Sequence, residues 1–274
     1  MDTAEEPYAG AREGLLGACR QVDERLARLA GGGADLAAEV HAIRKLGKKL
    51  RGGLMIACGD QGQIRQVGMI GRLLGEARDA SVLRETWADL WDLEPEEGSV
   101  EWVIDAMIGH QADRAGVAPP AEVVAWSREG VARVRETVEQ DALLATRCRE
   151  GSARMLRSLR KRLKRALERV EDEDFHAARK SVKFWLGGMK LVAPEPVEAV
   201  AGPLERLGDA LGHEHDLQVF GEWMRQHGFT PASAPRVWKR LPKVQSRARR
   251  RSLALVRKET LPQLKAVSRA AAKE

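Results

Sequence analysis

A histidine followed by regularly spaced cations occurs twice in this chain, and these residues are the best suited to bind an anion. On a helix, at about 100° per residue, each set falls on one face. Arginine grips phosphate oxygens with two hydrogen bonds, lysine adds a point charge, and a histidine beside them can donate to the same group. The first stripe contains His41, Arg44, Lys45, Lys48, Lys49 and Arg51, and the second contains His176, Arg179, Lys180, Lys183 and Lys190. The pattern predicts two cationic walls of one site for a linear polyanion.

The side opposite each stripe is apolar, so these helices are expected to pack into a core while presenting their charge. No acidic residue lies between Ala42 and Ala57, so the first stripe has no partner on its own helix. The apolar sides contain Ile43, Leu46, Leu50 and Leu54 in the first copy and Ala178, Val182, Trp185 and Met189 in the second. An unpaired row of like charges indicates an anionic ligand.

The two stripes are part of a longer repeat. Both read H-A-x-R-K-x-x-K and lie 135 residues apart, and LGEARDASV from Leu74 returns as LGHEHDLQV from Leu211, 137 residues later. Two matched pairs in one order predict an internal duplication. We expect a loose lead over residues 1–9, one helical bundle over 10–150, a second over 151–262, and a tail over 263–274. Gly151-Ser152 marks the expected boundary, with Ser152 a candidate N-cap.

The spacing of apolar residues is helical along the whole chain, and no alternating β pattern occurs. The predicted fold class is therefore all-α, with two helical bundles. Asp35 is placed to cap the helix that contains His41. Gly52-Gly53, near the end of that helix, predicts close packing or a bend.

The charge is unevenly distributed, which favours a polyanionic partner. Residues 1–140 contain 17 basic and 24 acidic residues, a net −7, whereas residues 141–274 contain 29 basic and 16 acidic residues, a net +13. A basic half of this size attracts nucleic acid, polyphosphate or an anionic membrane surface. Further cations are expected to extend the cationic surface, namely Arg157, Lys161, Arg165, Arg247, Arg250 and Arg251.

Several function classes find no support in the sequence. There is no apolar run long enough for a membrane span, no apolar leader, and no P-loop or paired nucleophile and base. Cys19, Cys58 and Cys148 are far apart and odd in number, typical of reduced thiols in a cytoplasmic protein. We expect no catalytic residue, no metal, no cofactor and no membrane partner.

One short segment offers a metal-site alternative. His213-Glu214-His215-Asp216 contains metal-ligand residue types, but its counterpart Glu76-Ala77-Arg78-Asp79 lacks both histidines. The shared residues are Asp79 and Asp216. We therefore interpret these two as helix caps or as partners of nearby cations.

A nucleic-acid-binding module is the main alternative, because RNA or DNA offers the same phosphates. Binders of single strands usually add aromatic stacking platforms. Here Phe184, Trp185 and Trp238 lie on or near apolar stripes and are predicted to belong to the core. No helix-turn-helix or zinc-finger spacing is present, so nucleic acid is the less favoured partner.

These residues resemble the CHAD family, the conserved histidine α-helical domain. Its pattern is His-x-x-Arg with cations one and two turns further on, present twice, each copy followed by an LG-x-x-x-Asp segment. His41, Arg44, Lys48, Lys49 and Arg51 resemble the first motif, and His176, Arg179 and Lys183 the second. Leu186-Gly187 stands where the second motif usually continues with Arg-Tyr. The resemblance extends over roughly residues 10–260.

The resemblance implies two four-helix bundles related by a pseudo-twofold axis, with a basic central cleft. It implies non-enzymatic binding of inorganic polyphosphate, often at polyphosphate granules in the cytoplasm. It also implies a separate triphosphate-tunnel (CYTH-type) enzyme as a partner, since no tunnel domain is present in this chain. An accessory role beside such a phosphohydrolase is a further alternative.

Overall fold

The chain is all-helical, as the periodicity predicts. The computed structural model describes residues 6–32, 35–57, 59–115 and 118–270, and these ranges contain helices and turns but no strand. After a 3-10 turn at Glu6–Tyr8, the helices are α1 (Ala11–Ala30), α2 (Leu36–Ile56), α3 (Gln61–Leu73), α4 (Gly75–Leu90), α5 (Val100–Ala115), α6 (Ala121–Gln140), α7 (Leu144–Arg169), α8 (Asp172–Val192), α9 (Pro194–Gln226), α10 (Pro235–Leu255) and α11 (Leu261–Ala270). A π-helical turn, Val256–Thr260, joins α10 to α11.

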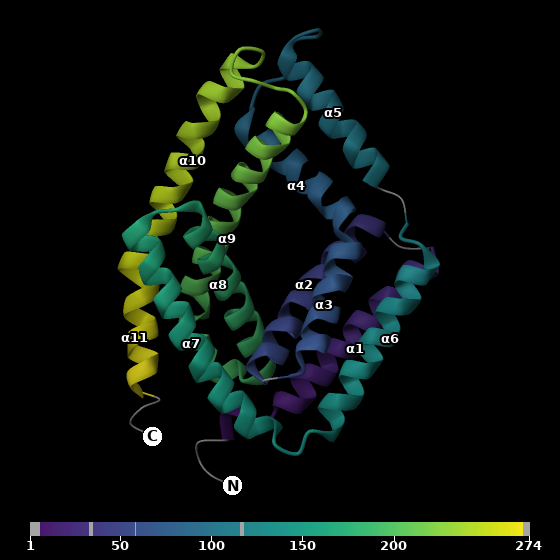
Figure 1. The fold of residues 1–274 in the computed structure, drawn as a ribbon, viewed down its shortest axis with the longest axis vertical. Helices are drawn as coiled ribbons and strands as arrows, with labels where there is room; N and C mark the ends of the chain where they lie inside the picture. The colour runs from purple at the N-terminus through teal and green to yellow at the C-terminus, as the bar shows by residue number, and fades with distance from the viewer. Residues whose placement is uncertain (1–5, 33–34, 58, 116–117, 271–274) are drawn as a thin grey trace.

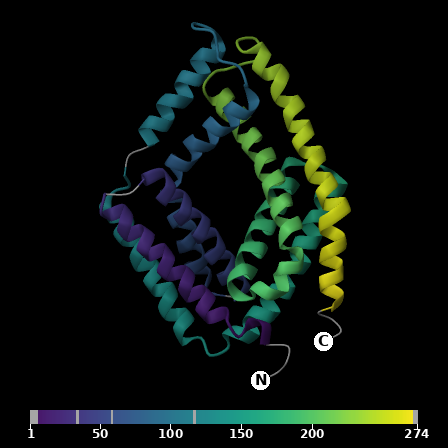
Figure 2. The same ribbon diagram turned by 180° about the vertical axis from the view of Figure 1, so that it is seen from behind.

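The helices outline a diamond, and α2 and α8 converge in its lower half, toward the end where the termini lie (Figure 1). One apolar core joins α1, α2, α3, α6, α7, α8, the first half of α9 and α11. A smaller core joins α4 and α5 to the second half of α9 and to α10, at the opposite end of the diamond (Figure 2). Both cores contain residues from before and after residue 150. The division into duplicated bundles stays a prediction.

Glycines let α2 and α8 cross at backbone contact. A Cβ on Gly52 would lie 2.2 Å from the carbonyl oxygen of Phe184, and a Cβ on Gly188 would lie 2.5 Å from the carbonyl carbon of Gly52. A Cβ on Gly187 would lie 3.3 Å from the Cα of Lys49. The prediction of close packing at Gly52-Gly53 is therefore confirmed, and the glycines of the second copy contribute the other side of the same crossing. This crossing brings the two cationic stripes together.

The predicted start and the predicted apolar side of α2 are both confirmed. The Asp35 carboxylate accepts a hydrogen bond from the Ala38 amide at 3.2 Å, which confirms the predicted N-cap. The Val40, Ile43, Leu50 and Leu54 side chains are buried on the side predicted to be apolar. Since α2 buries this side, its cations lie on the side that faces α3 and α8.

The prediction that Ser152 is an N-cap is wrong. Helix α7 runs from Leu144 to Arg169 without interruption, so Ser152 lies within it and caps nothing. Gly151 is buried because α7 packs closely on α2, and a Cβ there would lie 1.7 Å from the carbonyl oxygen of Ile56. The Ser152 hydroxyl donates to the carbonyl oxygen of Arg149 and lies 2.6 Å from the Tyr8 hydroxyl. Tertiary packing therefore explains both residues.

The described parts of the expected lead and tail contain regular structure. Tyr8 of the expected lead contacts α7, and α11 makes most of the expected tail helical. Residues 1–5 and 271–274 and Cys58 lie outside the described residues, whereas Cys19 and Cys148 are buried thiols. Within the described ranges, no helix combines the length and the apolar character that crossing a membrane requires.

Candidate functional site

The cations of α2 and α8 line two adjoining pockets. The arginine pocket, of about 270 Å³, is lined by residues of α2, α3 and α8, with Arg44, Lys48, Arg51, Arg72, Arg179, Lys180 and Lys183 as its cations. The lysine pocket, of about 420 Å³, is lined by residues of α2, α8 and α9, with His41, Arg44, Lys45, Lys48, Lys49, Lys183 and Lys190 as its basic residues. Arg44, Lys48 and Lys183 line both pockets. We call the two together the α2–α8 groove.

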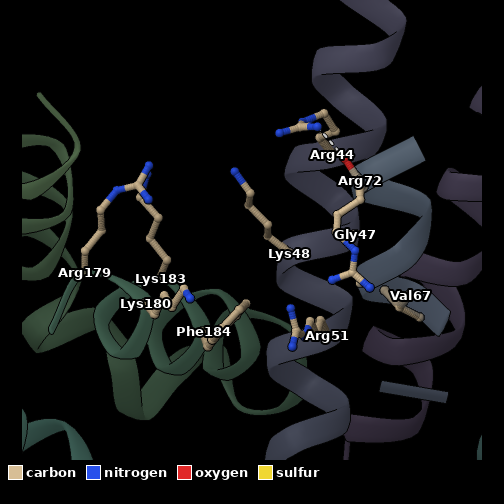
Figure 3. Close-up of a pocket in the computed structure, with 12 residues that line it drawn as sticks. Arg44, Gly47, Lys48, Arg51, Val67, Arg72, Arg179, Lys180, Lys183 and Phe184 are labelled. Carbon is tan, nitrogen blue, oxygen red and sulfur yellow. Dashed lines mark hydrogen bonds between the residues drawn. The ribbon is translucent and has the colours of Figure 1, made fainter. Parts of the chain in front are cut away.

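The arginine pocket is a cationic cavity between α2, α3 and α8. In Figure 3 the cations of α8, on the left, and of α2, on the right, face the same space, with Phe184 and Arg51 low between the two helices. The described residues that line this pocket include no acidic side chain. Its charge therefore favours an anion with several negative groups.

Two arginines are held in place by their neighbours. The Arg44 guanidinium donates from Nη1 to the carbonyl oxygen of Gly71 on α3. The Arg51 guanidinium lies over the Phe184 ring, 4.9 Å from its centroid, in a cation–π contact between α2 and α8. Gly68 leaves the room for Arg51, because a Cβ there would lie 3.2 Å from Nη1. These contacts aim fixed donors into the pocket.

Burial and neighbouring like charges both lower the pKa values of two groove cations. Burial first, and then the charge of Arg72, lower the pKa of Arg51. Burial also lowers the pKa of Lys49, and Lys45 and Lys190 lower it further. A bound anion would relieve this repulsion.

The lysine pocket differs from the arginine pocket because α9 brings carboxylates to its wall. Glu205 and Asp209 line it, and Lys190 forms an ion pair with Glu205. The Lys183 side chain lies against Gly212, where a Cβ would lie 3.7 Å from Nζ. The glycine of the second LG segment is therefore a neighbour of a groove lysine.

The structure brings most of the predicted stripe residues together. All six from the first copy line the groove, and from the second copy so do Arg179, Lys180, Lys183 and Lys190. His176 lies beside the groove, with its ring 4.9 Å from the ring of His215, centroid to centroid. The predicted extension lies elsewhere: Arg157, Lys161, Arg165, Arg247, Arg250 and Arg251 are exposed on α7 and α10 and line neither pocket. Their part in ligand binding stays a prediction.

Three residues in or near the groove were not predicted from the sequence to belong to the binding site. Arg72 lines the arginine pocket from α3, and Phe184, predicted to belong to the core, is half-buried at its base. His215 contacts His176 from α9. A helical wheel of residues 61–73 could have shown Arg72 on an exposed side, but only packing decides that this side meets α2 and α8.

The segment with metal-ligand residue types has other contacts. Glu214, 2% exposed, accepts from Arg249 at 2.6 Å, and Arg249 also pairs with Asp172. Asp216 lies inside α9, so its interpretation as a helix cap is wrong. The Asp79 side chain lies outside the described residues. Where side chains are described, no three His, Cys, Asp or Glu residues are grouped as a metal ion would require.

Comparison with known families identifies the class of this protein. A family model described as CHAD domain matches residues 60–225, which include the second stripe and both LG segments. The chain therefore belongs to the CHAD family. The first stripe, residues 41–54, precedes the matched range and joins the site through the crossing of α2 and α8.

A solved structure has the same fold. The crystal structure of the CHAD domain from the plant Ricinus communis matches with a TM-score of 0.55 and 18% sequence identity, over 96% of this chain and 92% of that chain. At this identity the likeness shows the fold alone. No curated protein matches.

Proposed function

We propose that this protein binds inorganic polyphosphate in the α2–α8 groove and does not hydrolyse it. The observation that carries the proposal is the groove itself: three shared residues, Arg44, Lys48 and Lys183, join two pockets lined by cations from three helices. Such a site suits a flexible chain of phosphates that runs from one pocket into the next. Family membership supports the same proposal.

Unmet hydrogen-bonding capacity in the groove favours an anionic ligand. Arg51 Nε is buried and finds no hydrogen-bond partner among the residues that the structure describes. A buried donor without a partner costs about 1–3 kcal/mol. A small rotation of the guanidinium toward the pocket would let a phosphate oxygen accept from Nε, and the phosphate would also offset the repulsion between Arg51 and Arg72.

The residue types that line the groove favour polyphosphate over nucleic acid as the ligand. Among the described residues that line the pockets, Phe184 is the one Phe, Tyr or Trp. Its ring already contacts Arg51. Single-strand binders use exposed rings on which bases stack. A ligand of phosphates alone needs no such platform.

A titration with long-chain polyphosphate at two salt concentrations, with RNA of matched charge as competitor, tests the proposal. We expect tight binding that weakens steeply with salt and that RNA does not displace, because several phosphate contacts release counterions. Equal or stronger RNA binding would replace polyphosphate with nucleic acid as the ligand. No binding of either would refute the groove as a polyanion site.

The non-enzymatic part of the proposal has its own test. Polyphosphate is incubated with the protein and divalent metal, alone and with a purified triphosphate-tunnel enzyme. We expect no phosphate release by the protein alone. Release would establish a hydrolase, and stimulation of the added enzyme would establish the accessory role. Location at polyphosphate granules in the cytoplasm follows from the proposal, and imaging of the tagged protein tests it.

A further inference from the structure

Two histidines from different helices lie ring against ring beside the arginine pocket. The rings of His176 on α8 and His215 on α9 have centroids 4.9 Å apart and planes tilted by 44°. Both side chains are half-buried. Arg179, one turn after His176, and Lys180 line the arginine pocket. The histidine pair thus neighbours the residues proposed to hold the ligand.

The cations of the groove act on this pair. Burial first, and then Lys180 and Arg179, lower the pKa of His176. Burial first, and then Arg179, His176, Lys183 and Lys180, lower the pKa of His215 to about 4. At neutral pH both rings are therefore uncharged, and the same side chains that would bind phosphate help to hold them so.

The acidic residues near the pair are already engaged. Glu214 and Asp172 both pair with Arg249 of α10, although burial raises the pKa of Glu214. Asp174 pairs with Arg165 of α7 at 2.8 Å. These contacts leave the groove cations as the main charges acting on the two rings.

The remaining neighbours of α8 and α9 complete the surroundings of the pair. From α4, Asp89 lies 4.0 Å from His213 rather than beside the pair. From α2, Arg44 and Lys48 line the arginine pocket together with Arg179. The cations that lower the pKa values of the two histidines are those of α8, namely Arg179, Lys180 and Lys183.

We propose that His176 and His215 form one proton-accepting unit of the polyphosphate site, so that polyphosphate binds together with protons. This inference rests on the proposed function. A phosphate chain against Arg179 and Lys183 offsets the charges that oppose protonation and so favours the imidazolium forms. An imidazolium has two N–H donors, so it adds both charge and hydrogen bonds to the site. By linkage, affinity must then rise as pH falls.

Calorimetric titration of the full chain with long-chain polyphosphate tests the inference. Titrations at pH 6 in two buffers of different ionisation enthalpy count the protons taken up, and long chains keep the contribution of terminal phosphates small. We expect net proton uptake, and an affinity that rises about tenfold per pH unit for each proton taken up. The pH range is 7.5 to 5.5, in which ordinary carboxylates stay charged.

Four variants assign the protons. His215→Asn and His176→Asn should each reduce the uptake, whereas His110→Asn, on the exposed side of α5, should leave it unchanged. Glu214→Gln should also leave it unchanged, which separates the histidines from the buried carboxyl group beside them. Circular dichroism melts confirm that each variant is folded.

The outcomes separate this inference from the proposed function. If polyphosphate does not bind at any pH, the proposed function fails and the inference fails with it. If polyphosphate binds with the same proton count in the wild type and in both histidine variants, the inference alone is wrong. Uptake that disappears only in Glu214→Gln would assign the protons to the carboxyl group and would also overturn the inference.

Discussion

Helices α7 and α10 contain more Lys and Arg residues than α2 and α8, yet the pockets are lined by the cations of α2 and α8. The stripes of α2 and α8 face each other across the groove, because glycines bring the two backbones into contact. Arg157 and Lys161 of α7 and Arg247 and Arg250 of α10 are exposed and line neither pocket. Cations that converge from two helices can contact one ligand together. A cationic helix that faces solvent adds only to the positive electrostatic potential around the protein.

The largest expected effect comes from a substitution at the close crossing of α2 and α8, which brings the two cationic stripes together. Gly52→Val places side-chain atoms where the Phe184 carbonyl oxygen lies, 2.2 Å from a Cβ. We expect a loss of roughly 3 kcal/mol or more in the free energy of unfolding, because backbone atoms must move apart. Urea denaturation measures it.

Gly47→Ala on the same helix is the matched control for this substitution. A Cβ at Gly47 meets nothing within 4 Å. The substitution should therefore stabilise α2 by about 0.5–1 kcal/mol. Equal stability changes in the two variants would contradict the close crossing.

The next largest effect distinguishes the groove cations from the exposed cations of α7 and α10. Arg44→Glu with Arg179→Glu should weaken polyphosphate binding roughly a hundredfold or more, since each lost charge-assisted contact costs about 1.5–3 kcal/mol. Helicity should remain, as measured by circular dichroism. Arg157→Glu with Arg250→Glu makes the same change of net charge outside the groove and should weaken binding only a few-fold. Similar losses of affinity in the two double variants would show that the ligand responds to the overall positive charge of the protein and is not held in the groove.

A smaller effect separates the two pockets. Glu205→Gln removes the partner of Lys190 and one negative charge from the wall of the lysine pocket. We expect polyphosphate affinity to rise two- to fivefold, in line with about 0.5–1 kcal/mol for a partly exposed charge. Glu195→Gln, an exposed substitution in the first turn of α9, is the control. Unchanged or weaker binding in Glu205→Gln would place the ligand in the arginine pocket alone.

The smallest effect is on acid stability without ligand. The pKa of His215 is lowered to about 4 in the folded chain, and that of His176 is also lowered, so between about pH 6.5 and 4 the unfolded chain binds protons that the folded chain does not. Stability should therefore fall as the pH falls through this window. His215→Asn should make the fall shallower, as urea midpoints at several pH values would show. An unchanged slope would argue against a neutral His215.

Sequence periodicity and charge were sufficient to predict several features of the fold. The apolar side of α2, with Ile43 and Leu50 fully buried, and its Asp35 cap follow from local physics, because helix spacing and capping depend on near neighbours. The all-α fold and the family membership were also predictable from the chain.

Other features could not be derived from local signals. Ser152 resembles an N-cap in sequence but lies inside α7, and Phe184 resembles a core residue but forms the base of a pocket. In each case the partner comes from a distant segment: the Ser152 hydroxyl contacts Tyr8, and the Phe184 ring contacts Arg51.

The sequence by itself determined which residues are cationic, on which side of each helix they lie, and that the pattern occurs twice. Only the tertiary structure decided that α2 and α8 cross at Gly52 and Gly188, that Arg72 joins their cations from α3, and that His215 meets His176. The physical reason is that helix periodicity is set by residues three and four positions apart. A groove, in contrast, depends on how side chains from distant helices pack together.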